Sequence, residues 1–150
     1  MIRRCISTAL TAAVLGIGVV SASVAADQHA LGQVSTKPNK VIFSVTDNDA
    51  AKWNLVLGNA KLVQHNVGPK NIDVEVVVWG PGINMLKMDS VAGNQVDELL
   101  QKGIKVVACE TTMHALKLTP QDMLPHIGYV PGGVIELMQK QQQGWAYVRP

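Results

Sequence analysis

Short runs of β-branched residues alternate with longer segments of helical periodicity in this chain, and this alternation limits the possible folds more than any other feature of the sequence. The runs at 41–46, 73–79 and 104–108 are rich in valine and isoleucine, as is typical of strands buried in a sheet. Apolar side chains recur at helical spacing from Ala50 to about Val67. Because parallel strands need a crossover between them, the alternation predicts one α/β domain with a mostly parallel sheet and helices on both faces.

Turn and capping residues indicate where these elements begin. Asp47 and Asp49 follow the first strand and are N-cap candidates for the helix at 50–67. A second helix is predicted to start at Asp89 or Ser90. Its expected buried face consists of Ala92, Val96, Leu99 and Leu100.

Shorter elements complete the pattern. They are a helix over 111–118, a strand over 126–130, a helix from the turn at 131–133 to about Gln142, and a strand over 145–149. The last of these helices carries the apolar residues Val134, Ile135, Leu137 and Met138.

The first 26 residues have the three parts of a secretory signal. Arg3 and Arg4 give a positive start, an apolar stretch follows, and small residues lead up to Ala26, where we expect cleavage. The apolar stretch is short for the ~20 residues that cross a membrane, which favours export over the alternative of an uncleaved anchor. The chain then divides into a signal peptide at 1–26, a flexible lead-in at 27–39 and one domain at 40–150.

Export changes both the cysteine count and the charge. Cys5 leaves with the signal, so Cys109 is the only thiol of the mature chain and has no internal disulfide partner. Removing Arg3 and Arg4 from the 13 Lys and Arg residues leaves 11, which balance 11 Asp and Glu. With no net charge and 4% aromatic residues, the chain lacks the basic surface and stacking platforms of nucleic-acid-binding proteins. We expect a periplasmic protein with no nucleic-acid partner and, after cleavage, no membrane partner.

Cys109 follows the third strand directly, at the sheet edge where parallel α/β domains bind ligands. Amides at the start of the next helix favour the thiolate form, which is the nucleophile. Thr111 and Thr112 are candidate hydrogen-bond donors to that thiolate, and His114 is a candidate proton donor or acceptor. This pattern predicts a reactive cysteine.

Three other interpretations of this edge stay open. A turn at the end of the second strand offers backbone N–H groups to a small anion, with candidate binding residues Gly80, Gly82 and Asn84. Soft donors that suit copper(I) are Cys109, Met113, His114, Met123 and His126, although no tight ligand motif accompanies them, and we predict neither a metal nor a cofactor. In the third interpretation, the cysteine is a buried core residue.

Several stretches of this sequence resemble the DsrE/DsrF-like family, and in particular its small exported branch. They are Val-Val-Ala-Cys-Glu-Thr-Thr-Met-His at 106–114, Leu-Thr-Pro-Gln-Asp-Met-Leu-Pro at 118–125, Gly-Tyr-Val-Pro-Gly-Gly-Val at 128–134, and matching segments at 47–54, 79–83 and 143–149. The similarity covers nearly all of 40–150. It implies a three-layer α/β/α domain with a five-stranded, mostly parallel sheet, and assembly into homo-oligomers, as trimers or hexamers.

The resemblance also implies a function for the cysteine. The well-understood cytoplasmic members relay sulfur, and the cysteine at the matching place carries a persulfide between partners. For this chain it implies that Cys109 accepts sulfur from a donor and passes it to an acceptor, as a sulfur carrier or sulfurtransferase without a cofactor. Its expected export separates it from those relays and leaves enzymatic activity open. The alternative is an oligomeric module that binds a small anion or a soft metal without turnover.

Overall fold

The computed structural model describes residues 37–150, and the predicted signal peptide and the lead-in up to residue 36 lie outside this range. The strands are β1 (Asn39–Val45), β2 (Ile72–Val78), β3 (Lys105–Cys109), β4 (Gly128–Val130) and β5 (Ala146–Val148). They form one sheet in the order β4-β3-β2-β1-β5, and all four neighbouring pairs are parallel. The predicted α/β class is confirmed, with a sheet in which every strand is parallel.

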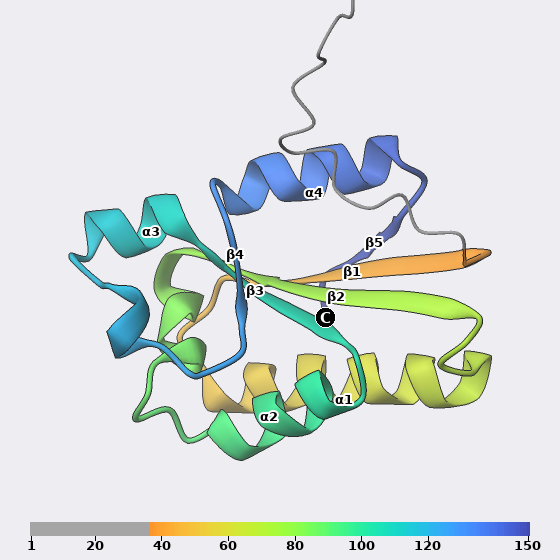
Figure 1. Ribbon diagram of the computed structural model, residues 1–150, viewed down its shortest axis with the longest axis horizontal. Coiled ribbons are helices and arrows are strands. Elements are labelled where there is room, and N and C mark those ends of the chain that lie inside the picture. The colour runs from red at the N-terminus through yellow and green to blue at the C-terminus, as the bar shows by residue number, and fades with distance from the viewer. Residues whose placement is uncertain (1–36) are drawn as a thin grey trace, which may run out of the picture. The chain divides into compact units, whose positions relative to one another are not determined.

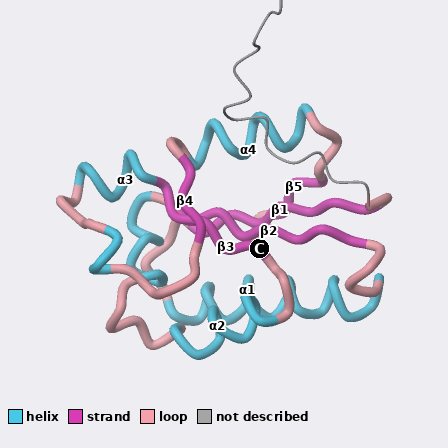
Figure 2. Tube along the Cα trace, viewed as in Figure 1, coloured by secondary structure: helices cyan, strands magenta, loops and turns pink. Residues whose placement is uncertain are grey.

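Each crossover between strands contains helix (Figure 2). The helices are α1 (Ala50–Val67), α2 (Gly93–Gln101), α3 (Glu110–Ala115) and α4 (Gly133–Gln142), with 3-10 turns η1 (Gly80–Leu86) and η2 (Pro120–Asp122). α1 and α2 lie on one side of the sheet and α3 and α4 on the other (Figure 1). Within residues 37–150, every helix is too short or too polar to span a bilayer.

The two faces of the sheet are unequal. Alternate side chains such as Phe43 and Val76 point toward α1 and α2 and join the larger apolar cluster, which includes Trp53 and Leu99. The opposite face has a much smaller cluster, made of Ile42, Val77, Val107, Val130, Leu137 and Trp145. The α4 side therefore supplies the smaller share of the apolar burial that stabilises the domain.

Local sequence signals explain the start of α1 but not the start of α2. Asp49 caps α1, since its side chain accepts hydrogen bonds from the amides of Ala51 (2.8 Å) and Lys52 (3.4 Å). The predicted cap of α2 at Asp89 or Ser90 was wrong. Ala92 is the N-cap there and has no side-chain cap. Ser90 instead closes the preceding turn by accepting from the Ala92 amide at 3.2 Å.

Three predicted boundaries shift. α3 ends at Ala115 rather than 118, and β5 covers only Ala146–Val148. β4 begins at Gly128, because His126 has a φ of 65° and cannot continue an extended strand. In α2, Val96 and Leu99 are buried as predicted, and Ala92 is buried beside them, whereas Leu100 is only partly buried.

α4 has an unusual orientation for a helix that covers a sheet. Of its apolar residues, Leu137 is buried, while Val134, Ile135 and Met138 are 66%, 53% and 50% exposed. The charged side chains of Glu136 and Lys140 are only 16% and 15% exposed. Residues 133, 136, 137 and 140 fall on one helical stripe, so α4 turns two charged residues toward the sheet and much of its apolar surface outward.

Candidate functional site

Cys109 lies where three elements meet. It is the last residue of β3 and the N-cap of α3. It lies two residues after Val107 in the strand, so both side chains point to the same face of the sheet, the α4 side. The amide of Gly133, the first residue of α4, donates a hydrogen bond to the sulfur at 3.3 Å. The residue is 4% exposed and its thiol is free. The sulfur thus occupies a position that a capping side chain would take at the start of α4.

Hydrogen bonding outweighs burial in setting the acidity of this thiol. Burial raises the pKa of Cys109, because the charged form loses hydration. The Thr112 hydroxyl and the amides of Thr112, Gly133 and Thr111 act in the other direction, since they stabilise the thiolate. The net result is a pKa below the ordinary value for cysteine. A buried cysteine that served only as an apolar core residue would have its pKa raised.

The two threonines have different tasks. Thr112 Oγ1 accepts a hydrogen bond from the Gly80 amide at 3.0 Å, which leaves its proton available for the sulfur. Thr111 Oγ1 donates to the carbonyl of Pro131 at 2.6 Å, and the Thr111 amide donates to the same carbonyl at 3.3 Å. Thr111 therefore fixes the segment that leads into α4, whereas Thr112 acts on the acidity of the thiol.

Close packing brings the first amide of α4 to the sulfur. A Cβ atom added at Gly133 would overlap the indole of Trp79 and lie 3.0 Å from the Trp79 Cβ. Only glycine lets the start of α4 approach the end of β2 this closely. Gly82 has a comparable role in η1, where an added Cβ would lie 2.7 Å from the carbonyl oxygen of Val45.

Replacing Thr112 with valine tests the largest contribution that favours the thiolate. We expect the Thr112→Val protein to fold and its thiolate fraction, measured below the pKa of the variant, to fall about tenfold, because a hydrogen bond to a charged group stabilises by ~1.5–3 kcal/mol. Thiolate absorbance at 240 nm across a pH titration measures this fraction. Thr112→Ser keeps the hydroxyl and should retain most of it; equal titrations for wild type and Thr112→Val would contradict the assignment.

The other predicted site residues lie near Cys109 with different surroundings. His114 is exposed in the last turn of α3, and no hydrogen bond joins it to the sulfur within residues 37–150. The amides of Gly80 and Gly82 already bond Thr112 and the carbonyl of Thr46. Asn84 donates to the Pro81 carbonyl at 3.2 Å. Roles for His114 in proton transfer and for residues 80, 82 and 84 in anion binding stay predictions.

The soft-metal interpretation gains no geometric support. Met113 and Met123 are buried in the larger apolar cluster, whereas His114 and His126 are exposed. In the described part of the chain, no three side chains of His, Cys, Asp or Glu are grouped to hold a metal ion. The five donors therefore belong to different environments.

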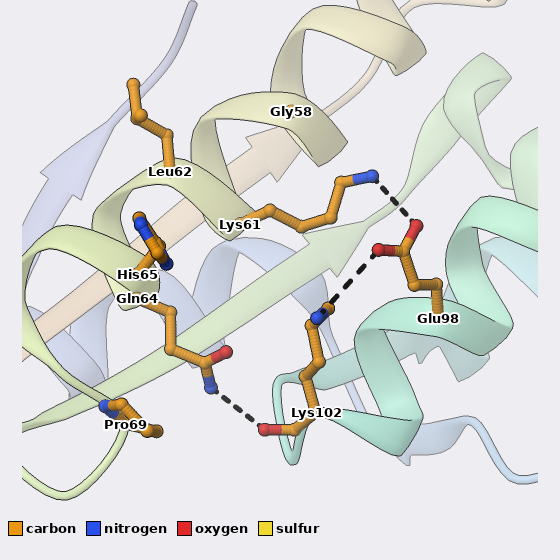
Figure 3. A pocket seen from close by; sticks show the side chains of 8 residues that line it. All are labelled: Gly58, Lys61, Leu62, Gln64, His65, Pro69, Glu98 and Lys102. Atoms are coloured by element: carbon orange, nitrogen blue, oxygen red, sulfur yellow. Dashed lines mark hydrogen bonds and ion pairs between the residues drawn. The ribbon is translucent and has the colours of Figure 1, made fainter.

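A cavity of about 610 Å³ lies between α1 and α2 (Figure 3). These helices cover the face of the sheet opposite the Cys109 side chain. The Glu98 carboxylate forms ion pairs across the cavity with Lys61 at 2.9 Å and with Lys102 at 4.0 Å. Gln64 Nε2 donates a hydrogen bond to the Lys102 carbonyl at 2.9 Å. The cavity is lined by Gly58, Lys61, Leu62, Gln64, His65, Pro69, Glu98 and Lys102. Lys61 and Lys102 share the single carboxylate of Glu98, so the lining carries one positive charge in excess.

Sequence reasoning missed how α4 takes part in the site. The turn at 131–133 lies at the predicted edge, but the sequence does not identify the Cys109 sulfur as the partner of the Gly133 amide. The usable signal is the second of two adjacent glycines directly before a predicted helix, a position where a backbone is often required to approach another group closely.

Several solved structures share this fold. A protein of unknown function from Methanobacterium thermoautotrophicum is 29% identical, with a TM-score of 0.71, and the match covers 75% of this chain and 99% of that one. A conserved protein of unknown function from Bacteroides thetaiotaomicron is 18% identical (TM-score 0.62; 75% and 95% covered). The ychN protein of E. coli is 13% identical (TM-score 0.61; 75% and 98% covered).

No curated protein matches the sequence. The model of the DsrE/DsrF-like family matches residues 39–150, which is the entire folded region from the start of β1. The parallel sheet and this match agree with each other. The chain belongs to the DsrE/DsrF-like family.

Proposed function

We propose that this protein handles sulfur, with Cys109 accepting a sulfur atom as a persulfide and passing it to an acceptor. The observation that carries the proposal is the hydrogen bonding of the Cys109 sulfur, which lowers its pKa although the residue is 4% exposed. The same donors, Thr112 and the Gly133 amide, suit a persulfide anion. Membership of the DsrE/DsrF-like family supports this chemistry.

The proposed loading step is a displacement with no net redox change. The Cys109 thiolate attacks the outer sulfur of a donor such as thiosulfate, and a bond forms between the two sulfur atoms. The sulfur–sulfur bond of the donor breaks, and its electron pair leaves with sulfite. The product is Cys109 persulfide, and attack by an acceptor thiolate on its outer sulfur returns Cys109 to the thiolate form.

Access to the sulfur requires movement, because Cys109 is buried. The segment that covers it runs from Pro131 to Gly133, and Thr111 holds the Pro131 carbonyl through two hydrogen bonds. We propose that this segment opens to admit the donor. Slow reaction of the resting protein with bulky thiol reagents and faster reaction with small ones follow from this arrangement.

Intact mass spectrometry tests the proposal. The protein without its signal is treated with thiosulfate or polysulfide, beside Cys109→Ser as the matched variant. We expect a gain of one sulfur atom that requires Cys109 and is reversed by reductant. Loading of Cys109→Ser to the same extent, or no loading of a protein whose thiol reacts with iodoacetamide, would exclude the carrier function. Binding of a small anion without a mass gain would then favour the alternative module without turnover.

We also propose that the protein is exported to the periplasm and acts as a homo-oligomer, a trimer or hexamer. Apolar side chains on its surface support assembly: Leu55 and Leu62 on α1 are 51% and 56% exposed, and the outer side of α4 is apolar. Light scattering coupled to size exclusion measures the oligomer size, and a monomer at micromolar concentration would argue against it.

A further inference from the structure

α4 is held to the sheet largely by a buried ionic contact. Among its ten residues, only Gly133 and Leu137 are buried. Lys140 Nζ lies 2.7 Å from Glu75 Oε2 and 3.3 Å from Glu136 Oε1, and it sits 4.4 Å above the ring of Trp145. Because so little apolar surface is buried by this helix, the position of α4 depends on the Glu75–Lys140 contact more than is usual for a covering helix.

Burying the Glu75 carboxylate in a central strand costs folding free energy. It is 2% exposed in the middle of β2, and its Oε1 is the one buried side-chain oxygen or nitrogen without a hydrogen-bond partner within 37–150. Burial raises the pKa of Glu75, as does the neighbouring Glu136, and Lys140 opposes them. An apolar residue at this position would avoid that cost, so a specific role for the carboxylate is indicated.

Lys140 and Gly133 belong to the same rigid element. Seven residues separate them, which is about 10 Å, or two turns, along a helix. A ten-residue helix fixed at Lys140 carries its first amide with it as a unit. The contact at one end of α4 therefore acts together with the packing of Gly133 on Trp79 to hold the Gly133 amide 3.3 Å from the Cys109 sulfur.

We propose that Glu75 is a positioning residue for Cys109, acting through Lys140 to hold the start of α4 against the sulfur. The inference adds a residue to the proposed sulfur chemistry and depends on it only for its biological purpose. It identifies a side chain at the opposite end of α4 as a determinant of thiol reactivity.

The direction of the change in the Cys109 thiol pKa when Glu75 is replaced distinguishes a positioning role from a direct electrostatic effect. Removing the negative charge of Glu75 would, by its field alone, make the Cys109 thiolate easier to form and lower the thiol pKa. Loss of positioning has the opposite effect, because the Gly133 hydrogen bond to the thiolate is weakened. Glu75→Met removes the carboxylate at similar length and leaves the Lys140–Glu136 pair in place.

The experiment measures the rate of alkylation by iodoacetamide against pH in the folded protein. We expect Glu75→Met to have a higher thiol pKa than wild type and a thiolate fraction at neutral pH that is at least about threefold smaller. Glu75→Gln keeps an oxygen that accepts from Lys140 and should fall between the two. Glu75→Gln is nearly isosteric with wild type. The sign of its shift in the Cys109 thiol pKa therefore tests the positioning role even where Glu75→Met fails to fold.

A matched control is Lys61→Met, which breaks an ion pair with Glu98 on the other side of the sheet and should leave the titration unchanged. An unchanged or lower thiol pKa in the Glu75 variants would overturn the inference. Alkylation does not require sulfur transfer, so a shifted titration in a protein that never loads sulfur would leave the positioning role intact and reject only the carrier function.

Discussion

Replacing Lys140 with methionine is expected to destabilise the folded protein by about 3–5 kcal/mol near pH 7.5 and by much less near pH 4.5. The variant leaves the Glu75 carboxylate, 2% exposed, without its cation and next to Glu136. Breaking a buried pair from one side costs more than the pair contributes, because an uncompensated charge remains in the interior.

The direction of the pH dependence follows from the pKa of Glu75, which burial raises above its ordinary value. The folded state then holds the proton more tightly than the unfolded chain. The stabilisation that comes from this tighter proton binding is complete below about 4.5, the pKa of Glu75 in the unfolded chain. It is lost as the pH rises through the pKa of Glu75 in the folded protein. Without Lys140 that folded pKa is higher still, so the difference between variant and wild type widens from acid toward neutral pH.

Urea unfolding at several pH values measures this difference, and effects common to both proteins cancel. The matched control is Lys61→Met, whose partner Glu98 is half-exposed, so the loss of this pair should change the free energy of unfolding little at every pH. A destabilisation of Lys140→Met that is the same at pH 4.5 and 7.5 would show that the loss is one of packing against Trp145 and not of charge.

Gly133→Ala is expected to destabilise the protein by about 1–3 kcal/mol and to raise the pKa of Cys109 at the same time. The added methyl group would overlap the indole of Trp79, so the start of α4 must move away from β2. The amide that donates to the sulfur moves with it. Urea unfolding and thiolate absorbance at 240 nm measure the two effects.

Gly58→Ala is the control for the change of residue type, because an added Cβ in the middle of α1 meets nothing within 4 Å. It should stabilise by about 0.5–1 kcal/mol and leave the thiol unaffected. A smaller residue at position 79 should restore part of the stability of Gly133→Ala, since the two positions are in contact. Additive effects of the two substitutions would show that their contact does not set the position of α4.

Much of the fold could be predicted because local chemistry and tertiary structure agree. Valine-rich runs became β1, β2 and β3, and Asp49 caps the helix that it was expected to cap. The position of Cys109 between a strand and a helix followed from those assignments. Each of these features is decided by a few neighbouring residues.

The orientation of α4 could not be read from its own sequence. Its apolar residues Val134, Ile135, Leu137 and Met138 surround half the helix, and periodicity alone does not say which side is covered. Glu75 in β2 determines which side of α4 faces the sheet, since the carboxylate buried under α4 requires Lys140 to point toward it. The signal available in advance was a single charged residue inside a run of valines, because buried charges are nearly always paired.

The position of β5 beside β1 has a consequence for how the chain is made. β5 runs beside β1 (Figure 1). Ala146, Tyr147 and Val148 pair with residues 41–43, and the hydroxyls of Ser44 and Tyr147 lie 2.9 Å apart although 103 positions separate them in the sequence. β1 is translated first and β5 after all other strands, so one edge of β1 stays open while the ribosome completes the rest. An open apolar edge is a template for pairing with another chain. We infer that nascent chains of this protein are most exposed to misassembly just before residues 146–148 are added.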